Sequence, residues 1–287
     1  MHNRSSLTSG IFYPEDREKL ISMLRNFCRA PSDAPVPLPA ALFIPHAAYD
    51  RTLIHIGAAC SAITSESPSR IILLAPIHAD ILQEDRPHTI FCTNNTRIET
   101  PLGSLLIEKE STDYLTSHYG KDVAIGDYYF QEEPSIGLAA PLITYRYPET
   151  EVLPLLVGGS SAKTAAALAT ILNELTDKKT LIILSMNLSA WDAADRSLLE
   201  RKLLIEQLTA YTGAKRPPLL DLYQKKQIRT CGIVLLEALH RTGMCTGPWN
   251  ILSTEESDKR QLPLLEKNKK TQYGSGIMSL HTQEMEC

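Results

Sequence analysis

Two histidines and an asparagine stand where apolar runs of the chain end, so these positions are where we first expect chemistry. His46 follows Phe43-Ile44-Pro45, His78 follows the run from Ile71 to Ile77, and Asn187 follows the run from Leu181 to Met186. In an open α/β sheet, ligands bind outside the carboxyl ends of the strands. Neutral imidazole is the commonest metal ligand in proteins. The pattern therefore favours a metal site, although each histidine taken alone is also compatible with a structural role.

The elements that must position these histidines form a predicted βαβ unit. A strand is expected over 40–44, a helix over 52–63 and a second, continuously apolar strand over 70–75, as in a parallel sheet buried on both faces. Neighbouring parallel strands lie about 4.8 Å apart. We therefore expect the two imidazoles to converge on one point.

Three further motifs each admit two interpretations. Cys231 lies at the start of a predicted helix, where a thiol can become a thiolate, but it also stands just before the apolar run Ile233 to Leu236 and is compatible with a buried cysteine. The stretch 158–164 follows a strand and opens a helix, so it is either a turn with a helix cap or an anion site, without the full phosphate-loop spacing. Asn187 is a poor metal ligand, and we expect it to cap a loop.

The rest of the chain predicts one α/β domain over 11–280, with a central mixed, mostly parallel sheet flanked by helices. We expect a flexible N-terminus over 1–10, a proline-rich connection over 31–39, a charged loop over 255–270 and a tail over 281–287. Pro141 is expected to kink or interrupt a helix over 133–145. Further helices are expected from about 14 to 27 and over 112–119, 162–175, 194–210, 219–225 and 231–241, with strands over 89–93, 105–108, 151–157, 180–185, 249–252 and 276–280.

Composition narrows the function classes. The net charge of −4 gives no electrostatic reason to expect binding to nucleic acid or acidic membranes. No stretch approaches the roughly 20 apolar residues that span a bilayer, and the first residues carry no apolar secretory core, so we expect a cytoplasmic protein. The six cysteines are dispersed without a CxxC pair, and we expect no disulfide framework. The motifs of serine hydrolases and dinucleotide sites, G-x-S-x-G and G-x-G-x-x-G, do not occur.

Seven motifs, in order along nearly the whole chain, resemble those of the Memo family, the protein B component of the AmmeMemoRadiSam system. The family patterns are G-x-W-Y-P, A-P-H-A-G-Y, G-P-x-H, x-T-P-L-G, V-P-[IL]-L-V-G, S-S-D-[LF]-[SC]-H-[WY] and C-G. The matching segments of this chain are 9–14, 44–49, 74–78, 99–103, 153–158, 185–191 and 230–232.

The resemblance implies a fold similar to class III extradiol dioxygenases of the LigB type, with a metal cleft at the strand ends. The family's metal ligands correspond to His46, His78 and Cys231. The residues that would line the same cleft are Tyr49, Pro134, Gly137, Asn187, Ala190 and Trp191.

Several of these residues depart from the family pattern. Asn187 replaces an aspartate and Ala190 a histidine, while Pro134 and Gly137 replace a histidine and an acid in the H-S-[IL]-E-x-[QH]-L-P segment. The resemblance thus implies a degenerate site that has lost its carboxylate and the nearest candidates for general acid or base.

Two functions are compatible with these departures. The first is a non-catalytic or weakly metal-binding Memo-like protein, and the second is a metal-dependent redox enzyme that uses His46, His78 and Cys231. The cofactor would be one copper, iron or zinc ion, or none, and a His₂Cys set suits copper or zinc better than iron. The resemblance also implies a radical SAM protein and an AMMECR1-like protein as partners.

Overall fold

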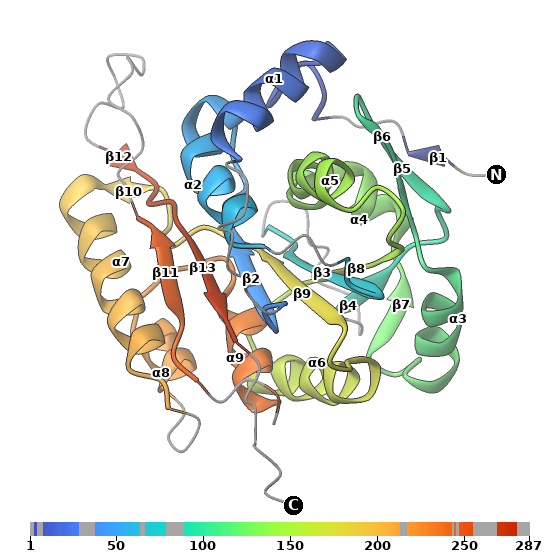
Figure 1. Cartoon of the computed structure of the whole chain (residues 1–287). Helices are drawn as coiled ribbons and strands as arrows, with labels where there is room; N and C mark the ends of the chain where they lie inside the picture. Colours follow the sequence, from blue (N-terminus) through green and yellow to red (C-terminus); the bar gives the residue numbers. More distant parts are fainter. Residues whose placement is uncertain are drawn as a thin grey trace, which may run out of the picture.

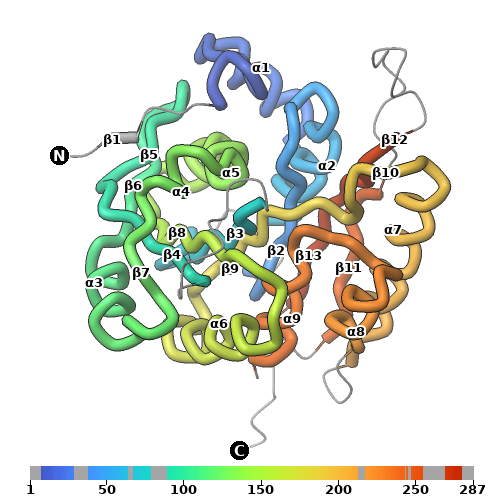
Figure 2. The backbone as a smooth tube through the Cα atoms, turned by 180° about the vertical axis from the view of Figure 1, so that it is seen from behind, coloured from blue at the N-terminus to red at the C-terminus, as the bar shows by residue number. Residues whose placement is uncertain are grey.

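The architecture is a three-layer α/β/α domain around an eight-stranded mixed sheet with the order β11-β13-β2-β9-β3-β8-β4-β7 (Figures 1 and 2). We describe a computed structural model, covering residues 3–4, 8–28, 38–63, 67–78, 89–212, 217–242, 244, 247–254 and 269–279. The central strands are β2 (Ala41–Ile44), β9 (Thr180–Ser185), β3 (Arg70–Pro76) and β8 (Val152–Val157), and they run parallel to one another. The single α/β domain with a mixed sheet, expected from the sequence, is confirmed.

The outer strands of the large sheet include antiparallel pairs. β13 (Ser275–Met278) pairs antiparallel with both β2 and β11 (Asn250–Ser253), and β4 (Ile90–Cys92) pairs antiparallel with β8 and parallel with β7 (Val123–Ile125). The remaining strands form two small sheets: β1 (Asn3–Arg4), β5 (Arg97–Thr100) and β6 (Gly103–Leu106) in one, and β10 (Asp192–Ala193) with β12 (Lys269–Lys270) in the other.

Helices cover both faces of the sheet. One face packs against α1 (Arg17–Phe27), α2 (Tyr49–Ala62), α4 (Asp127–Glu132) and α5 (Pro134–Arg146). The other packs against α3 (Lys109–His118), α6 (Ala162–Leu175), α7 (Ala194–Thr209), α8 (Leu219–Gln224) and α9 (Ile233–Arg241).

A hydrophobic core lies on each face of the sheet, and the two-residue period of the central strands explains why there are two. In β3, Ile72 and Leu74 point into the core with α6 and α9, whereas Ile71 and Leu73 point into the core with α2 and α5. Successive side chains of a strand face opposite sides, so a strand buried on both faces must be apolar throughout. This requirement explains why the sequence predicts the central strands well.

The topology corrects one expectation from the sequence. β2 and β3 are not neighbours, because β9 lies between them and pairs with both. The histidines that follow β2 and β3 must therefore converge across the end of a third strand.

Several local expectations are also corrected. Strand β7 and helix α4 were not predicted, and α5 runs continuously from Pro134 to Arg146 with Pro141 inside it. The expected strands over 89–93 and 105–108 do not pair with each other: β4 belongs to the large sheet, and β6 instead forms an antiparallel hairpin with β5, which was not predicted. The proline-rich connection over 31–39 lies almost wholly outside the described residues, as do most of the charged loop over 255–270 and the tail over 281–287. Of residues 1–10, the described 3–4 form β1 and pair with β5.

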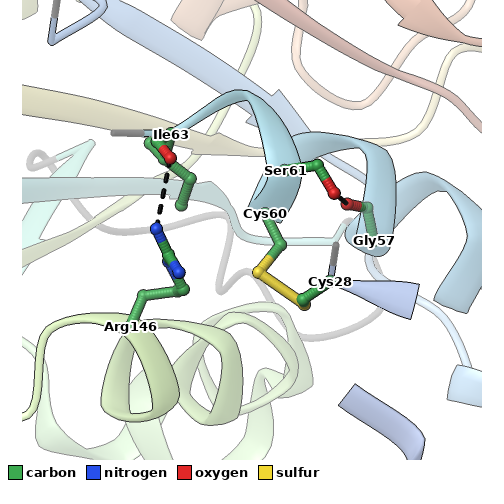
Figure 3. The surroundings of a disulfide bond; sticks show 6 residues. All are labelled: Cys28, Gly57, Cys60, Ser61, Ile63 and Arg146. Carbon is green, nitrogen blue, oxygen red and sulfur yellow. Dashed lines mark hydrogen bonds between the residues drawn. A yellow bond between two sulfur atoms is a disulfide. The ribbon is translucent and has the colours of Figure 1, made fainter. Parts of the chain in front are cut away.

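A disulfide between Cys28 and Cys60 joins the end of α1 to α2, with the two Cα atoms 5.2 Å apart (Figure 3). The helices approach closely because Gly57, one turn before Cys60, has no side chain: a Cβ there would lie 2.6 Å from the Cβ of Phe27. This single bridge departs from the expectation of dispersed, unpaired cysteines, because the contact between Cys28 and Cys60 depends on how α1 packs on α2. Among the described residues, no helix combines the length and apolarity needed to cross a bilayer.

Candidate metal centre

The structure brings His46, His78 and Cys231 together at the carboxyl edge of the central strands. His46 lies two residues after β2, His78 two residues after β3, and Cys231 two residues before α9. One ligand atom from each side chain lies within 4.8 Å of the other two. The two imidazole rings meet edge to face with their centroids 5.1 Å apart. The expected convergence of the two histidines is therefore confirmed, and Cys231 joins them.

The loop that carries Cys231 is fastened to the end of β9. Thr230 Oγ1 donates to the Asn187 carbonyl at 2.6 Å, and the Asn187 backbone N–H donates to Cys231 Sγ at 3.2 Å. Gly232 permits this approach, because a Cβ at that position would lie 2.6 Å from both Cβ and Sδ of Met186. The end of β9 therefore fixes the position of the sulfur.

Asn187 also ties this loop to His46. Its Oδ1 accepts from the His46 backbone N–H at 3.1 Å, and its Nδ2 donates to the His46 carbonyl at 3.4 Å. These contacts match the loop-capping role expected for Asn187, and they use the amide in ways that an aspartate could not fully reproduce. Asn187 thus connects the two ligand-bearing loops.

Hydrogen bonds determine which nitrogen of His46 faces the sulfur. Ser185 Oγ donates its single proton to the Ser135 carbonyl at 2.9 Å, so towards His46 Nδ1, 3.1 Å away, it acts as an acceptor. His46 Nδ1 must therefore carry a proton. The other nitrogen, Nε2, lies 3.5 Å from Cys231 Sγ and holds the lone pair in the neutral ring.

His78 is held by Glu133, a carboxylate that the sequence analysis did not select. Glu133 is fully buried, and its Oε2 lies 2.9 Å from His78 Nδ1 and accepts from the His78 backbone N–H, also at 2.9 Å. Its Oε1 accepts from the Ser135 backbone N–H at 3.1 Å and thereby caps α5. The signal in the sequence was an acidic residue directly before a proline at a helix start.

Glu133 changes the expectation that this site has lost its carboxylate. The family's aspartate is indeed Asn187 here, but a carboxylate still lies against His78 from the N-cap of α5. The position of the family's lost acid, Gly137, instead faces Thr8, whose Oγ1 would lie 2.9 Å from a Cβ at residue 137. Glu133 therefore gives the site a carboxylate that the departures from the family pattern did not predict.

The charges of the site depend on one another. Burial raises the pKa of the Cys231 thiol, but His46 and His78 lower it more strongly, to about 6. Hydrogen bonds with Cys231 and Glu133 raise the pKa of His78 to about 10. Burial also raises the pKa of Glu133, but His78 holds it below its ordinary value. Near neutral pH the site holds a thiolate, an imidazolium and a carboxylate, so a metal ion must displace the proton of His78 to bind.

The other residues expected around the site lie in varied surroundings. Tyr49 is fully buried beside Tyr13 and donates through its hydroxyl to the Leu138 carbonyl at 2.9 Å. Trp191 is 39% exposed, and Ala190 is half-buried in the same segment after β9. Pro134, half-buried, is the first residue of α5, and Gly137 is buried one turn later.

The glycine-rich stretch over 158–164 serves as a turn and helix cap. Gly159 has a φ of +77°, a backbone conformation that favours glycine. Ser161 Oγ accepts from the Thr164 backbone N–H at 3.0 Å and caps α6. The structural interpretation of this stretch is confirmed.

Comparison with known proteins places the chain in a family. The sequence profile described as "Memo-like protein" matches residues 4–262. The chain belongs to the Memo family. A MEMO1 family protein of Aquifex aeolicus is 26% identical over 82% of this chain and 84% of its own length, and one of Methanobrevibacter smithii is 24% identical over 68% and 72%. The crystal structure of an uncharacterized protein from Escherichia coli K12 covers 83% of this chain and 98% of its own, with 13% identity and a TM-score of 0.50, which supports the fold.

Proposed function

We propose that this Memo family protein binds one soft transition-metal ion, zinc or copper, through His46, His78 and Cys231. The observation that carries the proposal is the convergence of the three ligand atoms to within 4.8 Å of one another. Two imidazole nitrogens and a thiolate form a donor set suited to these ions. Each donor is also held by a hydrogen bond from the protein: Ser185 contacts His46, Glu133 contacts His78, and the Asn187 N–H donates to the sulfur.

The protonation states of the three side chains are also compatible with metal binding. In its neutral form the His46 ring directs the lone pair of Nε2 towards the sulfur, and a thiol with a pKa of about 6 is largely a thiolate at neutral pH. His78, whose pKa is raised to about 10, must lose a proton before it can act as a ligand. The affinity is therefore expected to rise with pH, because deprotonated ligands bind the metal.

The test is the metal content of the purified protein. We would purify it without oxygen and without added metal, reconstitute a portion with Zn²⁺ or Cu⁺, and compare it with the variants His46→Ala and Cys231→Ser. The exposed His118, on α3, provides the matched control His118→Ala. We expect about one ion per chain in the wild type and the control, and little in the two ligand variants. A wild-type protein that stays free of metal after reconstitution would refute the proposal.

A second candidate function, a metal-dependent redox enzyme, is favoured by the exposure of the site. The side chain of His78 is 41% exposed, so a small molecule can reach the ligands, and three protein ligands leave a position open. A copper ion held there would supply one-electron chemistry. The test is electron paramagnetic resonance of copper-loaded protein: reversible loss and return of the Cu²⁺ signal with ascorbate and air supports this function. A signal that never changes favours a weakly binding or non-catalytic protein.

Family membership is the basis for a proposal about partners. A radical SAM protein and an AMMECR1-like protein of the same system are the partners we propose. Co-purification of the three proteins after co-expression would support this assignment, and separate elution of all three would contradict it.

A further inference from the structure

The first turn of α5 is hydrogen-bonded to His78 directly and to His46 through a serine hydroxyl. Glu133 bonds directly to His78, through the ring Nδ1 and the backbone N–H, each at 2.9 Å. The carbonyl of Ser135, two residues later, accepts from the hydroxyl of Ser185, and that hydroxyl oxygen lies 3.1 Å from His46 Nδ1. One short segment, 133–135, therefore contacts His78 directly and His46 through Ser185.

We propose that segment 133–135 orients the two histidine ligands of the metal site, and that Glu133 is the residue that holds His78 with Nε2 directed at the metal. The inference rests on the proposed function, because it assigns a role in binding the same ion. Metal-bound histidines commonly donate their second ring N–H to a carboxylate or carbonyl, which fixes the orientation and basicity of the ring. Here Glu133 supplies the carboxylate beside His78. At His46, the hydroxyl of Ser185 lies between the ring and the Ser135 carbonyl.

The burial of Glu133 and the length of its side chain indicate that it does more than cap α5. A buried carboxylate is costly unless it is fully hydrogen-bonded, and Glu133 is fully buried with contacts to both Ser135 and His78. Serine, threonine or aspartate would cap the helix equally well. Oε1 of Glu133 accepts from the Ser135 backbone N–H, and Oε2 contacts both the backbone N–H and the ring Nδ1 of His78.

The exposure of His78 makes this contact decisive. With 41% of its side chain exposed, the ring is open on one side, and Glu133 holds the other. As whole residues, His46 is buried whereas His78 is half-buried, and His46 is confined by its surroundings as well as by Ser185. We therefore expect loss of the Glu133 contact to weaken metal binding more than loss of the Ser185 contact.

The experiment measures zinc affinity by competition with a chromophoric chelator. Replacing an outer partner of this kind lowers affinity about 10- to 100-fold, and we expect that loss in Glu133→Gln and a smaller one in Ser185→Ala. The matched control is Glu108→Gln, which alters another buried glutamate, at the N-cap of α3, that pairs with Arg70 instead of a histidine. An affinity unchanged in Glu133→Gln would overturn the proposal.

A double-variant comparison separates positioning from general destabilisation. If Glu133 acts through His78, adding Glu133→Gln to His78→Ala leaves the residual zinc affinity unchanged. A further loss of similar size in the His78→Ala background would show that Glu133 acts through folding, and it would overturn the inference.

A second readout does not need metal and separates this inference from the proposed function. In protein labelled with ¹⁵N-histidine, we expect a protected Nδ1 proton on His78 in the wild type and its loss in Glu133→Gln. If the wild type binds no zinc but shows this proton, the metal proposal fails while the orientation of His78 by Glu133 stands. If the proton is the same in both proteins, the positioning role is refuted whatever the metal content.

Discussion

Reduction of the Cys28–Cys60 disulfide is expected to lower the free energy of unfolding by about 3 to 4 kcal/mol. The bridge closes a loop between residues 32 apart in sequence. The chain-entropy relation for a loop of that length gives about 3.7 kcal/mol at 25 °C, because the cross-link restricts mainly the unfolded chain. The folded state should change little, since Leu20 and Leu24 of α1 are fully buried in the same core as α2 and hold the helix in place.

The assay is urea unfolding followed by circular dichroism, with and without a phosphine reductant. Cys28→Ser should unfold at the same urea concentration in both conditions, and it should match the reduced wild type. The slope of the transition should also increase on reduction, because a chain without the cross-link exposes more surface when it unfolds. Thiol titration of the unfolded protein counts the free sulfhydryl groups in each sample.

Two results would refute this reasoning. Equal stability of the oxidised and reduced wild type, with reduction verified by thiol titration, would show that the bridge does not constrain the unfolded chain. Free thiols at both cysteines in protein purified under air would show that the bridge does not form.

Three further outcomes are expected. Burial lowers the pKa of His55 to about 4 from 6.5, so the unfolded state binds more protons between these values; the contribution of His55 to stability should fall by about 1.6 kcal/mol from pH 6.5 to pH 5, and urea unfolding should show a correspondingly smaller fall in His55→Gln. Gly232→Ala places a Cβ 2.6 Å from Met186 and should cost about 1–3 kcal/mol while weakening zinc binding, whereas Gly247→Ala, with open space around it, should change neither. Leu73→Ala, in the centre of β3, should lower the unfolding free energy by about 2–5 kcal/mol, and a loss under 1 kcal/mol would contradict its place in the core.

The sequence by itself determined the local elements and two of the three proposed ligands. The strands β3, β8 and β9 are recognisable because burial on both faces requires an unbroken apolar run. Helix α6 begins at Ser161, whose side chain supplies the expected cap. His46 and His78 stood out because each follows a proline at the end of such a strand, and the carboxyl edge of a sheet is where sites form.

Only the tertiary structure decided which elements lie side by side. No local pattern places β9 between β2 and β3, because strand order depends on contacts between segments more than 100 residues apart, as in the pairing of Ala41 with Ile182. The same is true of Cys231, which is 185 residues from His46 in sequence and 3.5 Å from it in space. The family resemblance had to supply this ligand, because spacing along the chain could not.

Glu133 shows most clearly where sequence reasoning ends. Its neighbours Pro134 and Gly137 lack the polar groups of the family pattern, and no spacing along the chain links it to His78. The fold brings it to His78, 55 residues away in sequence, because the start of α5 lies at the end of β3, where Ser135 Oγ donates to the Pro76 carbonyl at 3.3 Å. A residue's type and its neighbours state what it can do, whereas the packing of distant elements determines what it meets.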